Sequence, residues 1–136
     1  MFVPVNELAI LVSALLAVAV GNIWYSPLLF GSIWMKSLGS HIGDDVYPKK
    51  EVFIVVLREV AVQFIFFYAL AQLIGVVAYT QVSIWNVGLW MLVLIIAMLI
   101  HIFVWERRSL NYILVHCGYG AIILYGGLLV LVYWPW

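Results

Sequence analysis

The chain has 136 residues, of which 68% are hydrophobic and 9% charged, and its formal net charge is zero. A water-soluble domain carries roughly 25% charged residues, so this composition cannot cover a water-facing surface and excludes a soluble globular protein. The zero net charge gives no electrostatic reason to expect nucleic acid as a partner, and the single cysteine, Cys117, cannot form an internal disulfide. The length leaves room for one domain, residues 1–136, with four membrane helices of about 20 residues each.

The first span is predicted over residues 5–25, and Pro27 ends it because proline cannot continue the backbone hydrogen-bond ladder. No Lys or Arg precedes Glu7, whereas a signal peptide begins with positive charge, so we expect this span to be retained. The next apolar stretch, Val52–Ala78, is longer than a hydrocarbon core of ~30 Å requires. We therefore place the crossing part of the second span at residues 58–78.

The third and fourth spans are predicted over residues 85–105 and 111–134. Only residues 79–84 and 106–110 separate the later spans, and connections this short force antiparallel hairpins. The predicted fold class is thus an all-α membrane protein with four transmembrane helices in an antiparallel bundle.

The connection at residues 26–50 is the only one long enough to have structure of its own. Its apolar residues recur at spacings of three and four, which is typical of one face of a short helix lying in the membrane interface. These residues are Leu28, Leu29, Phe30, Ile33, Trp34 and Leu38. The remainder, rich in Gly and Asp, is predicted to be a polar loop.

The basic residues predict the orientation, because Lys and Arg in short loops stay on the cytoplasmic side. All six lie in or beside the first and third connections: Lys36, Lys49, Lys50, Arg58, Arg107 and Arg108. We therefore expect a multi-pass protein of the cytoplasmic membrane with both termini outside. Aromatic belts agree with this orientation: Trp24, Tyr25, Trp34, Trp105 and Tyr112 would mark the inner interface, and Tyr79, Trp85, Tyr133, Trp134 and Trp136 the outer one.

Several polar side chains lie within the predicted spans, and we expect them to form an intramembrane polar cluster. They are Glu59, Gln63, Gln72, His101 and His116. Glu59, like Arg58, would lie at the inner interface if residues 60–78 fill the hydrocarbon core. The glutamines can line a substrate path, but hydrogen bonding between helices explains them without a ligand.

The two histidines are predicted at similar depth on neighbouring helices, so they could meet. With Cys117 they are candidate ligands of a metal, and as a pair they could hold haem or a pigment. Two histidines and one cysteine match no recognised ligand pattern, and hydrogen bonds to a neighbouring carbonyl, Glu59 or Tyr112 are the favoured explanation. No cofactor is therefore predicted.

Small residues recur every four positions along the first span, at Ala9, Ser13, Ala17 and Gly21. Such a stripe allows another helix to approach closely, either within the chain or from a partner. The sequence contains no nucleophile with its base, no carboxylate pair and no glycine-rich phosphate loop, so an enzyme is not expected.

One segment carries a family resemblance. It begins at Asn22 and contains Trp24-Tyr25-Ser26-Pro27, Gly31 and Trp34, and it is followed later by Trp105-Glu106-Arg107-Arg108 and Gly118-Tyr119. This pattern, which spans almost the whole chain, resembles the uncharacterised bacterial membrane family called domain of unknown function 1761. The resemblance implies a small four-helix protein of the bacterial inner membrane and supplies no activity.

The same segment also has a physical interpretation as a sharp exit from the membrane. Pro27 would stop the first helix, Ser26 would cap the next one, and Asn22 would bond backbone freed by the bend. These roles require no ligand.

The preferred prediction is a non-enzymatic packing or accessory subunit that acts through helix–helix association. Its partners would be lipids and either further copies of itself or a larger membrane complex. The alternatives are a small transporter or channel, and a haem- or pigment-binding subunit that uses His101 and His116. The first span has no acid beyond Glu7 at its outer end, which weakens the transporter alternative.

Overall fold

The computed structural model describes residues 4–38, 52–106 and 109–135, and over these ranges its regular structure is helical. The helices are α1 (Glu7–Trp24), α2 (Gly31–Ser37), α3 (Val52–Val77), α4 (Ile84–Glu106) and α5 (Leu110–Tyr133). All except α2 contain stretches long and apolar enough to cross a membrane. This confirms the predicted fold class, including the short helix after the first span.

Some expectations lie outside the described residues. They concern the polar loop after residue 38, the basic residues Lys49, Lys50, Arg107 and Arg108, and the side chains of Trp105 and Trp136.

Local sequence sets the helix ends. The Asn6 side chain accepts a hydrogen bond of 3.1 Å from the Ala9 amide and so caps α1. Ser109 does the same for α5, accepting from the Tyr112 amide at 3.3 Å. These caps satisfy amides that have no partner inside the helix.

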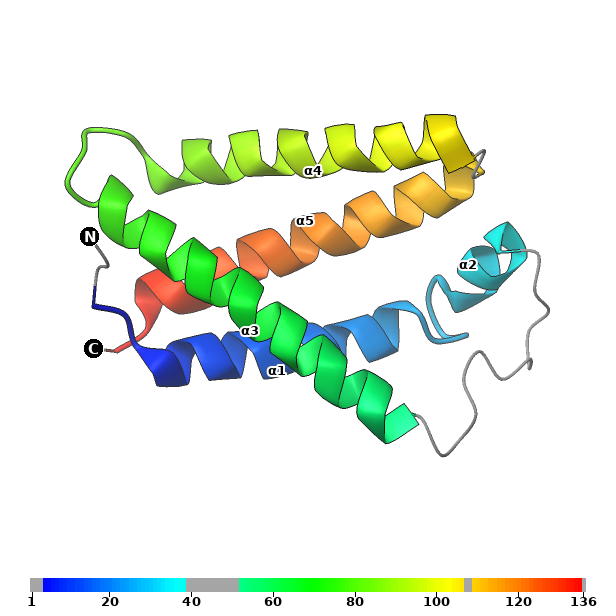
Figure 1. The fold of residues 1–136 in the computed structure, drawn as a ribbon, viewed down its shortest axis with the longest axis horizontal. Helices are drawn as coiled ribbons and strands as arrows, with labels where there is room; N and C mark the ends of the chain where they lie inside the picture. Colours follow the sequence, from blue (N-terminus) through cyan, green and yellow to red (C-terminus); the bar gives the residue numbers. More distant parts are fainter. Residues whose placement is uncertain (1–3, 39–51, 107–108, 136) are drawn as a thin grey trace.

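The helix α3 is longer than its predicted span, because it is already helical at Val52. Its 26 residues correspond to about 39 Å at 1.5 Å per residue, which exceeds a hydrocarbon core of ~30 Å. Figure 1 shows that α3 runs diagonally across α1 and α5 instead of parallel to them, so the helix is inclined relative to its neighbours.

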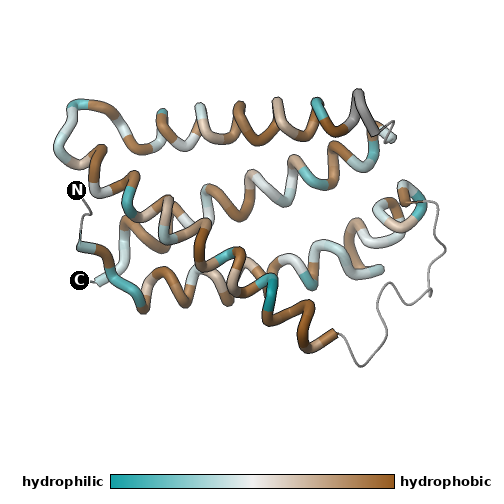
Figure 2. Tube along the Cα trace, in the orientation of Figure 1, coloured by the Kyte–Doolittle hydropathy of each residue, from teal (hydrophilic) through white to brown (hydrophobic). Residues whose placement is uncertain are grey.

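The helices form two groups. The first group is α1, α3 and α5, which pack on one another, and the second is α4, which packs chiefly along α5. The described ends of the chain and the α3–α4 turn lie at one end of the molecule, whereas α2 lies at the opposite end, against α5 (Figure 1). We call the latter the motif end. Figure 2 shows that apolar residues run along all the long helices.

The core lies where α1, α3 and α5 cross. Ile10, Phe67, Leu124 and Leu128 are almost fully buried there. A Cβ atom on Gly127 would overlap the Phe67 ring, with Cδ1 only 2.8 Å away. The crossing therefore depends on a glycine in α5 facing an aromatic ring from α3.

The small-residue stripe of α1 is used inside this core. Ala9, Ser13 and Ala17 are all at most 3% exposed, and a Cβ atom on Gly21 would meet the Tyr119 hydroxyl at 2.9 Å. Of the two uses predicted for the stripe, the structure therefore shows packing within the chain.

Candidate functional site at the motif end

A compact turn follows α1 and shapes the motif end. The Phe30 amide donates to the Trp24 carbonyl at 3.0 Å, and the Gly31 amide donates to the Ser26 carbonyl at 2.9 Å. A Cβ atom on Gly31 would collide with the Tyr25 carbonyl oxygen and lie 2.6 Å from the Ser26 carbonyl carbon. Glycine is therefore required for the chain to fold back so closely.

Two predicted roles in this turn are wrong. Ser26 does not cap α2, whose first turn has no side-chain cap; its hydroxyl donates to the Ile23 carbonyl at 2.7 Å and accepts from the Leu28 amide at 3.3 Å. Asn22 does not bond backbone freed by the bend, because its amide donates to the Val18 carbonyl within α1. Both side chains bond the nearest backbone groups in sequence, a local alternative that such residues commonly adopt.

Trp24 attaches this turn to α5. Its indole Nε1 donates to the Val115 carbonyl at 3.1 Å, and its ring lies 4.4 Å from the ring of Phe30. A Cβ atom on Gly118 would come within 2.8 Å of the indole. The glycine thus makes room for the tryptophan, and two parts of the family pattern that are distant in sequence meet here.

Tyr25 lies at the centre of an aromatic group. Its ring centroid is 5.2 Å from that of Trp34, 5.3 Å from that of Tyr119 and 5.5 Å from that of His116, always at tilted or edge-on angles. The side chains of Tyr25, Trp34, Tyr119 and His116 are all half-buried. Rings from the α1 end, α2 and α5 therefore face a common region.

His116 is held in one orientation. Its ring stacks on that of Tyr112 at 4.1 Å, and Nδ1 lies 2.9 Å from the Tyr112 carbonyl oxygen. Because a carbonyl oxygen only accepts, Nδ1 carries the proton and donates. The predicted structural role of His116, with a hydrogen bond to a neighbouring carbonyl, is therefore present.

Glu59 brings a carboxylate to this region from α3. Its Oε1 accepts a hydrogen bond of 2.8 Å from the Gln63 amide nitrogen, one helical turn deeper. Gln63 is buried, whereas Glu59 is exposed. Burial raises the pKa of Tyr25 above its ordinary value, and the charges of Tyr119, Tyr112 and, last, Glu59 add to this direction.

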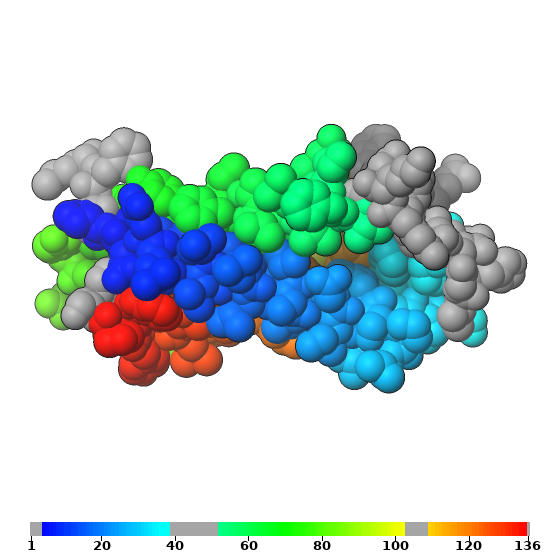
Figure 3. All heavy atoms as spheres, turned by 90° about the horizontal axis from the view of Figure 1, so that it is seen from below, coloured from blue at the N-terminus to red at the C-terminus, as the bar shows by residue number. Residues whose placement is uncertain are grey.

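The space-filling view shows that three helices come together at the motif end. Figure 3 shows atoms of α5 between α3 and the end of α1 at the motif end. The Tyr119 hydroxyl links α5 to α1 by donating to the Ala17 carbonyl at 3.2 Å. We call Glu59, Gln63, Tyr25, Tyr119 and His116 the motif-end cluster.

One predicted cluster residue, Gln72, lies elsewhere. Gln72 is 13 residues beyond Glu59 on α3, or about 20 Å along the helix. His101 is on an exposed part of α4, and its meeting with His116 stays a prediction. The five residues therefore do not form one cluster, although Glu59 and Gln63 do meet.

Metal ligation finds limited support. Among the residues that the structure describes, no three His, Cys, Asp or Glu side chains are grouped to hold a metal ion. Cys117 is a half-buried free thiol. The two-histidine haem or pigment site stays a prediction.

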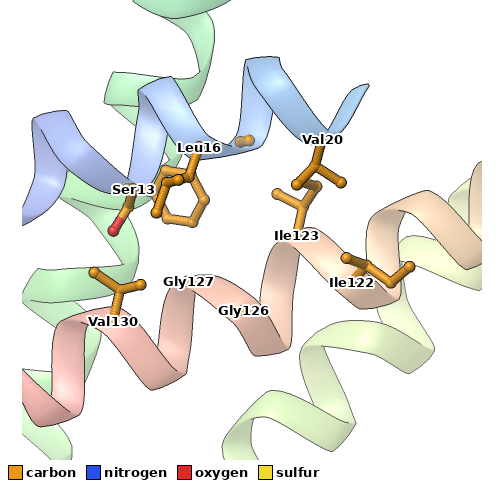
Figure 4. A pocket seen from close by; sticks show the side chains of 10 residues that line it. Ser13, Leu16, Val20, Ile122, Ile123, Gly126, Gly127 and Val130 are labelled. Atoms are coloured by element: carbon orange, nitrogen blue, oxygen red, sulfur yellow. The ribbon is translucent and has the colours of Figure 1, made fainter. Parts of the chain in front are cut away.

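A separate hollow of about 220 Å³ lies between α1 and α5, with Phe67 of α3 among its lining residues (Figure 4). Its lining is apolar apart from Ser13, whose hydroxyl donates to the Ala9 carbonyl at 2.8 Å. Because that polar group is already bonded, the hollow offers no chemistry of its own.

Comparison with protein-family models gives a match. The family model described as "Protein of unknown function (DUF1761)" matches residues 8–132. No curated protein and no solved structure matches the chain.

Proposed function

The chain belongs to the DUF1761 family, and because that family supplies no activity, we propose from the site itself that the protein is a non-enzymatic membrane protein that binds a ligand at the motif-end cluster. The observation that carries the proposal is Glu59, an exposed carboxylate within a helix apolar enough to span the membrane. An ionisable group at the membrane boundary of a spanning helix is a candidate group for binding a ligand or ion.

The surroundings of Glu59 support binding over a purely structural role. Its hydrogen bond comes from the neutral Gln63 amide, which orients the carboxylate without neutralising it. A structural carboxylate in an apolar region is usually paired with a cation. In the part of the chain that the structure describes, an amide holds this carboxylate, an arrangement suited to a ligand that provides the positive charge.

Association with other membrane proteins is the second candidate function. The small-residue stripe no longer supports it, because those residues are buried within the chain. The observation in its favour is α4, which packs chiefly on α5 and has only 6% of its spanning window buried, against 33% for α5. The uncovered face, which includes Trp90 and Met98, could receive a second copy or a partner subunit as well as lipid.

We also propose that the protein resides in the bacterial inner membrane with the motif end in the cytoplasm. The support is the distribution of the six basic residues over the first and third connections. A reporter fused after Trp136 should be active only outside the cytoplasm, and one placed between residues 40 and 48 only inside. The opposite pattern would contradict this orientation.

Ligand binding is tested by native mass spectrometry of the protein extracted in mild detergent. The wild-type protein should retain non-covalent small-molecule or lipid adducts, and Glu59→Gln should reduce their occupancy about tenfold, or ~1.4 kcal/mol. Because glutamine can keep a hydrogen bond with Gln63, the melting temperature should stay within about 2 °C of wild type.

The matched control is Glu7→Gln, which removes a carboxylate from the first turn of α1 at the opposite end of the molecule. It should leave the adducts unchanged. Equal adduct occupancy in the wild-type protein and the Glu59→Gln variant would overturn the proposed function.

A further inference from the structure

We propose that the hollow between α1 and α5 is a binding site for the acyl chain of a phospholipid, held at the gap that Gly126 leaves in α5. This site is separate from the motif-end cluster and does not involve Glu59. The depth, the lining and the rim of the hollow each support this occupant.

The hollow lies at the depth of lipid chains. Its lining runs from Ser13 to Val20 on α1 and from Ile122 to Val130 on α5, and both stretches lie inside helices apolar enough to cross a membrane. At 1.5 Å per residue, residues 122–130 extend about 12 Å along α5, which is less than half of a hydrocarbon core of ~30 Å. The hollow therefore has the length to hold part of one chain.

Gly126 leaves the space open. A Cβ atom at this position would meet nothing within 4 Å, so the glycine leaves a gap where most residues would place a side chain. Figure 4 shows that side chains close both ends of the hollow, Ser13 and Val130 at one end and Val20 and Ile123 at the other. Its volume of about 220 Å³ exceeds the ~150 Å³ of an apolar cavity that takes up benzene. There is thus room for several methylene groups.

The lining favours hydrocarbon over a polar ligand. Among the lining residues only Ser13 has a polar side chain, and its hydroxyl already donates to the Ala9 carbonyl. A ligand with a polar group at this depth would leave that group without a hydrogen bond, which costs free energy. An acyl chain has no such group, and it would supply dispersion contacts that the lining side chains lack beside a void.

The rim favours a flexible chain over a second helix. Leu16 of α1 and Ile122 of α5 both line the hollow and are 49% and 44% exposed. Close approach of two membrane helices requires small residues where they touch, and these two branched side chains would hold the backbone of another helix away. A chain of methylene groups can pass between them.

The bilayer itself supplies the chain. The protein has four candidate membrane spans, so the hollow opens toward phospholipid, whose acyl chains are the most abundant hydrocarbon in the membrane. A site that selects only for apolar surface is filled by the ligand present at the highest concentration. The occupant is therefore a phospholipid chain.

The test is photocross-linking in vesicles of phosphatidylethanolamine and phosphatidylglycerol, with a small fraction of phosphatidylethanolamine that carries a diazirine in one acyl chain. Labelled residues are identified by mass spectrometry of the digested protein. Leu16, Ile122 and the α4 residue Leu94 all lie about 10 residues from the same end of the bundle (Figure 1). Leu16 and Ile122 should be labelled at least about fivefold more than Leu94, although Leu94 is more exposed, at 66%.

Gly126→Leu should fill the hollow, reduce the labelling of Leu16 and Ile122 at least about fivefold, and leave that of Leu94 unchanged. Because the added side chain enters open space, the melting temperature should not decrease. Gly126→Val, a smaller addition, should reduce the labelling less and provides the same test if the leucine variant fails to fold.

Two controls separate this site from other effects. Ala97→Leu adds the same side chain at an exposed position of α4 and should leave the labelling of the hollow unchanged. Glu59→Gln should also leave it unchanged, so failure of the motif-end ligand and failure of the chain site are distinguishable.

Three results would contradict the proposal. The first is labelling of Leu16 and Ile122 no stronger than that of Leu94 in the wild-type protein. The second is undiminished labelling in folded Gly126→Leu and Gly126→Val variants. The third is a dimer, captured by a bifunctional cross-linker in the same vesicles, that Gly126→Leu abolishes, since a second copy would then occupy the hollow in place of lipid.

Discussion

The crossing of α1, α3 and α5 and the motif end share these three helices, and α2 belongs to the motif end alone. The two regions differ in which polar groups their side chains leave available for binding. At the crossing, Phe67, Gly127 and Leu124 fit by shape alone, and the hydroxyl of Ser13 is bonded to its own helix. The motif end has an exposed carboxylate bonded to a buried amide on α3, and it has a group of half-buried aromatic rings. Stability and binding should therefore be separable by substitution, because they depend on different ends of the same helices.

Of the substitutions that test this comparison, Gly127→Val is expected to have the largest effect on the melting temperature. The added side chain would overlap the Phe67 ring at the crossing, and overpacking of this kind costs about 3 kcal/mol. Thermal unfolding in detergent should show a large decrease in melting temperature. Ligand adducts, measured well below that temperature, should remain.

The neighbouring glycine gives a matched control. A Cβ atom on Gly126 meets nothing within 4 Å, so Gly126→Val should leave the melting temperature nearly unchanged. If both variants melt at the wild-type temperature, the crossing is not the region that limits stability, and the comparison between the two ends fails.

Gly31→Ala should have a smaller effect on unfolding and a larger one on binding. Its methyl group would collide with the backbone of Tyr25 and Ser26, so the turn must open at a cost of about 2 kcal/mol. Since Tyr25 belongs to that turn, adduct occupancy in native mass spectra should decrease together with the melting temperature. Unchanged adducts would show that the turn does not position the cluster.

The smallest effect is expected from Trp24→Phe. This change keeps an aromatic ring beside Phe30 and removes the indole hydrogen bond to the Val115 carbonyl. Loss of one such bond costs about 1 kcal/mol. Thermal unfolding should report a slight decrease, whereas a decrease as large as that of Gly127→Val would mean that attachment of the turn to α5 dominates the fold.

The sequence predicted the helices well because a membrane leaves the backbone few alternatives. The predicted spans agree closely with α1, α4 and α5, and the apolar spacing after Pro27 correctly indicated α2. Hydropathy could not indicate that α3 is helical from Val52, because a long apolar stretch is compatible with either a long tilted helix or a shorter upright one.

The site was harder to predict because it depends on how helices cross. Glu59 could be placed at the membrane boundary by counting residues, but the helices beside it depend on the diagonal path of α3 across α1 (Figure 1). Similarly, the sequence around Gly118 did not indicate that this glycine faces Trp24. The one available signal was the four-residue spacing of Glu59, Gln63 and Phe67, which places all three on one face of the helix.

The unequal helix lengths have a consequence for the surrounding bilayer. At 1.5 Å per residue, the 18 residues of α1 extend about 27 Å and the 26 residues of α3 about 39 Å. No single hydrocarbon thickness matches both helices. Beside α1, the bilayer must become thinner or interfacial side chains at the helix ends must snorkel toward the headgroups, whereas the longer α3 fits by tilting. A thicker membrane would favour a more upright α3. Because Glu59 lies on that helix, hydrophobic mismatch would change the depth of the carboxylate relative to Tyr25.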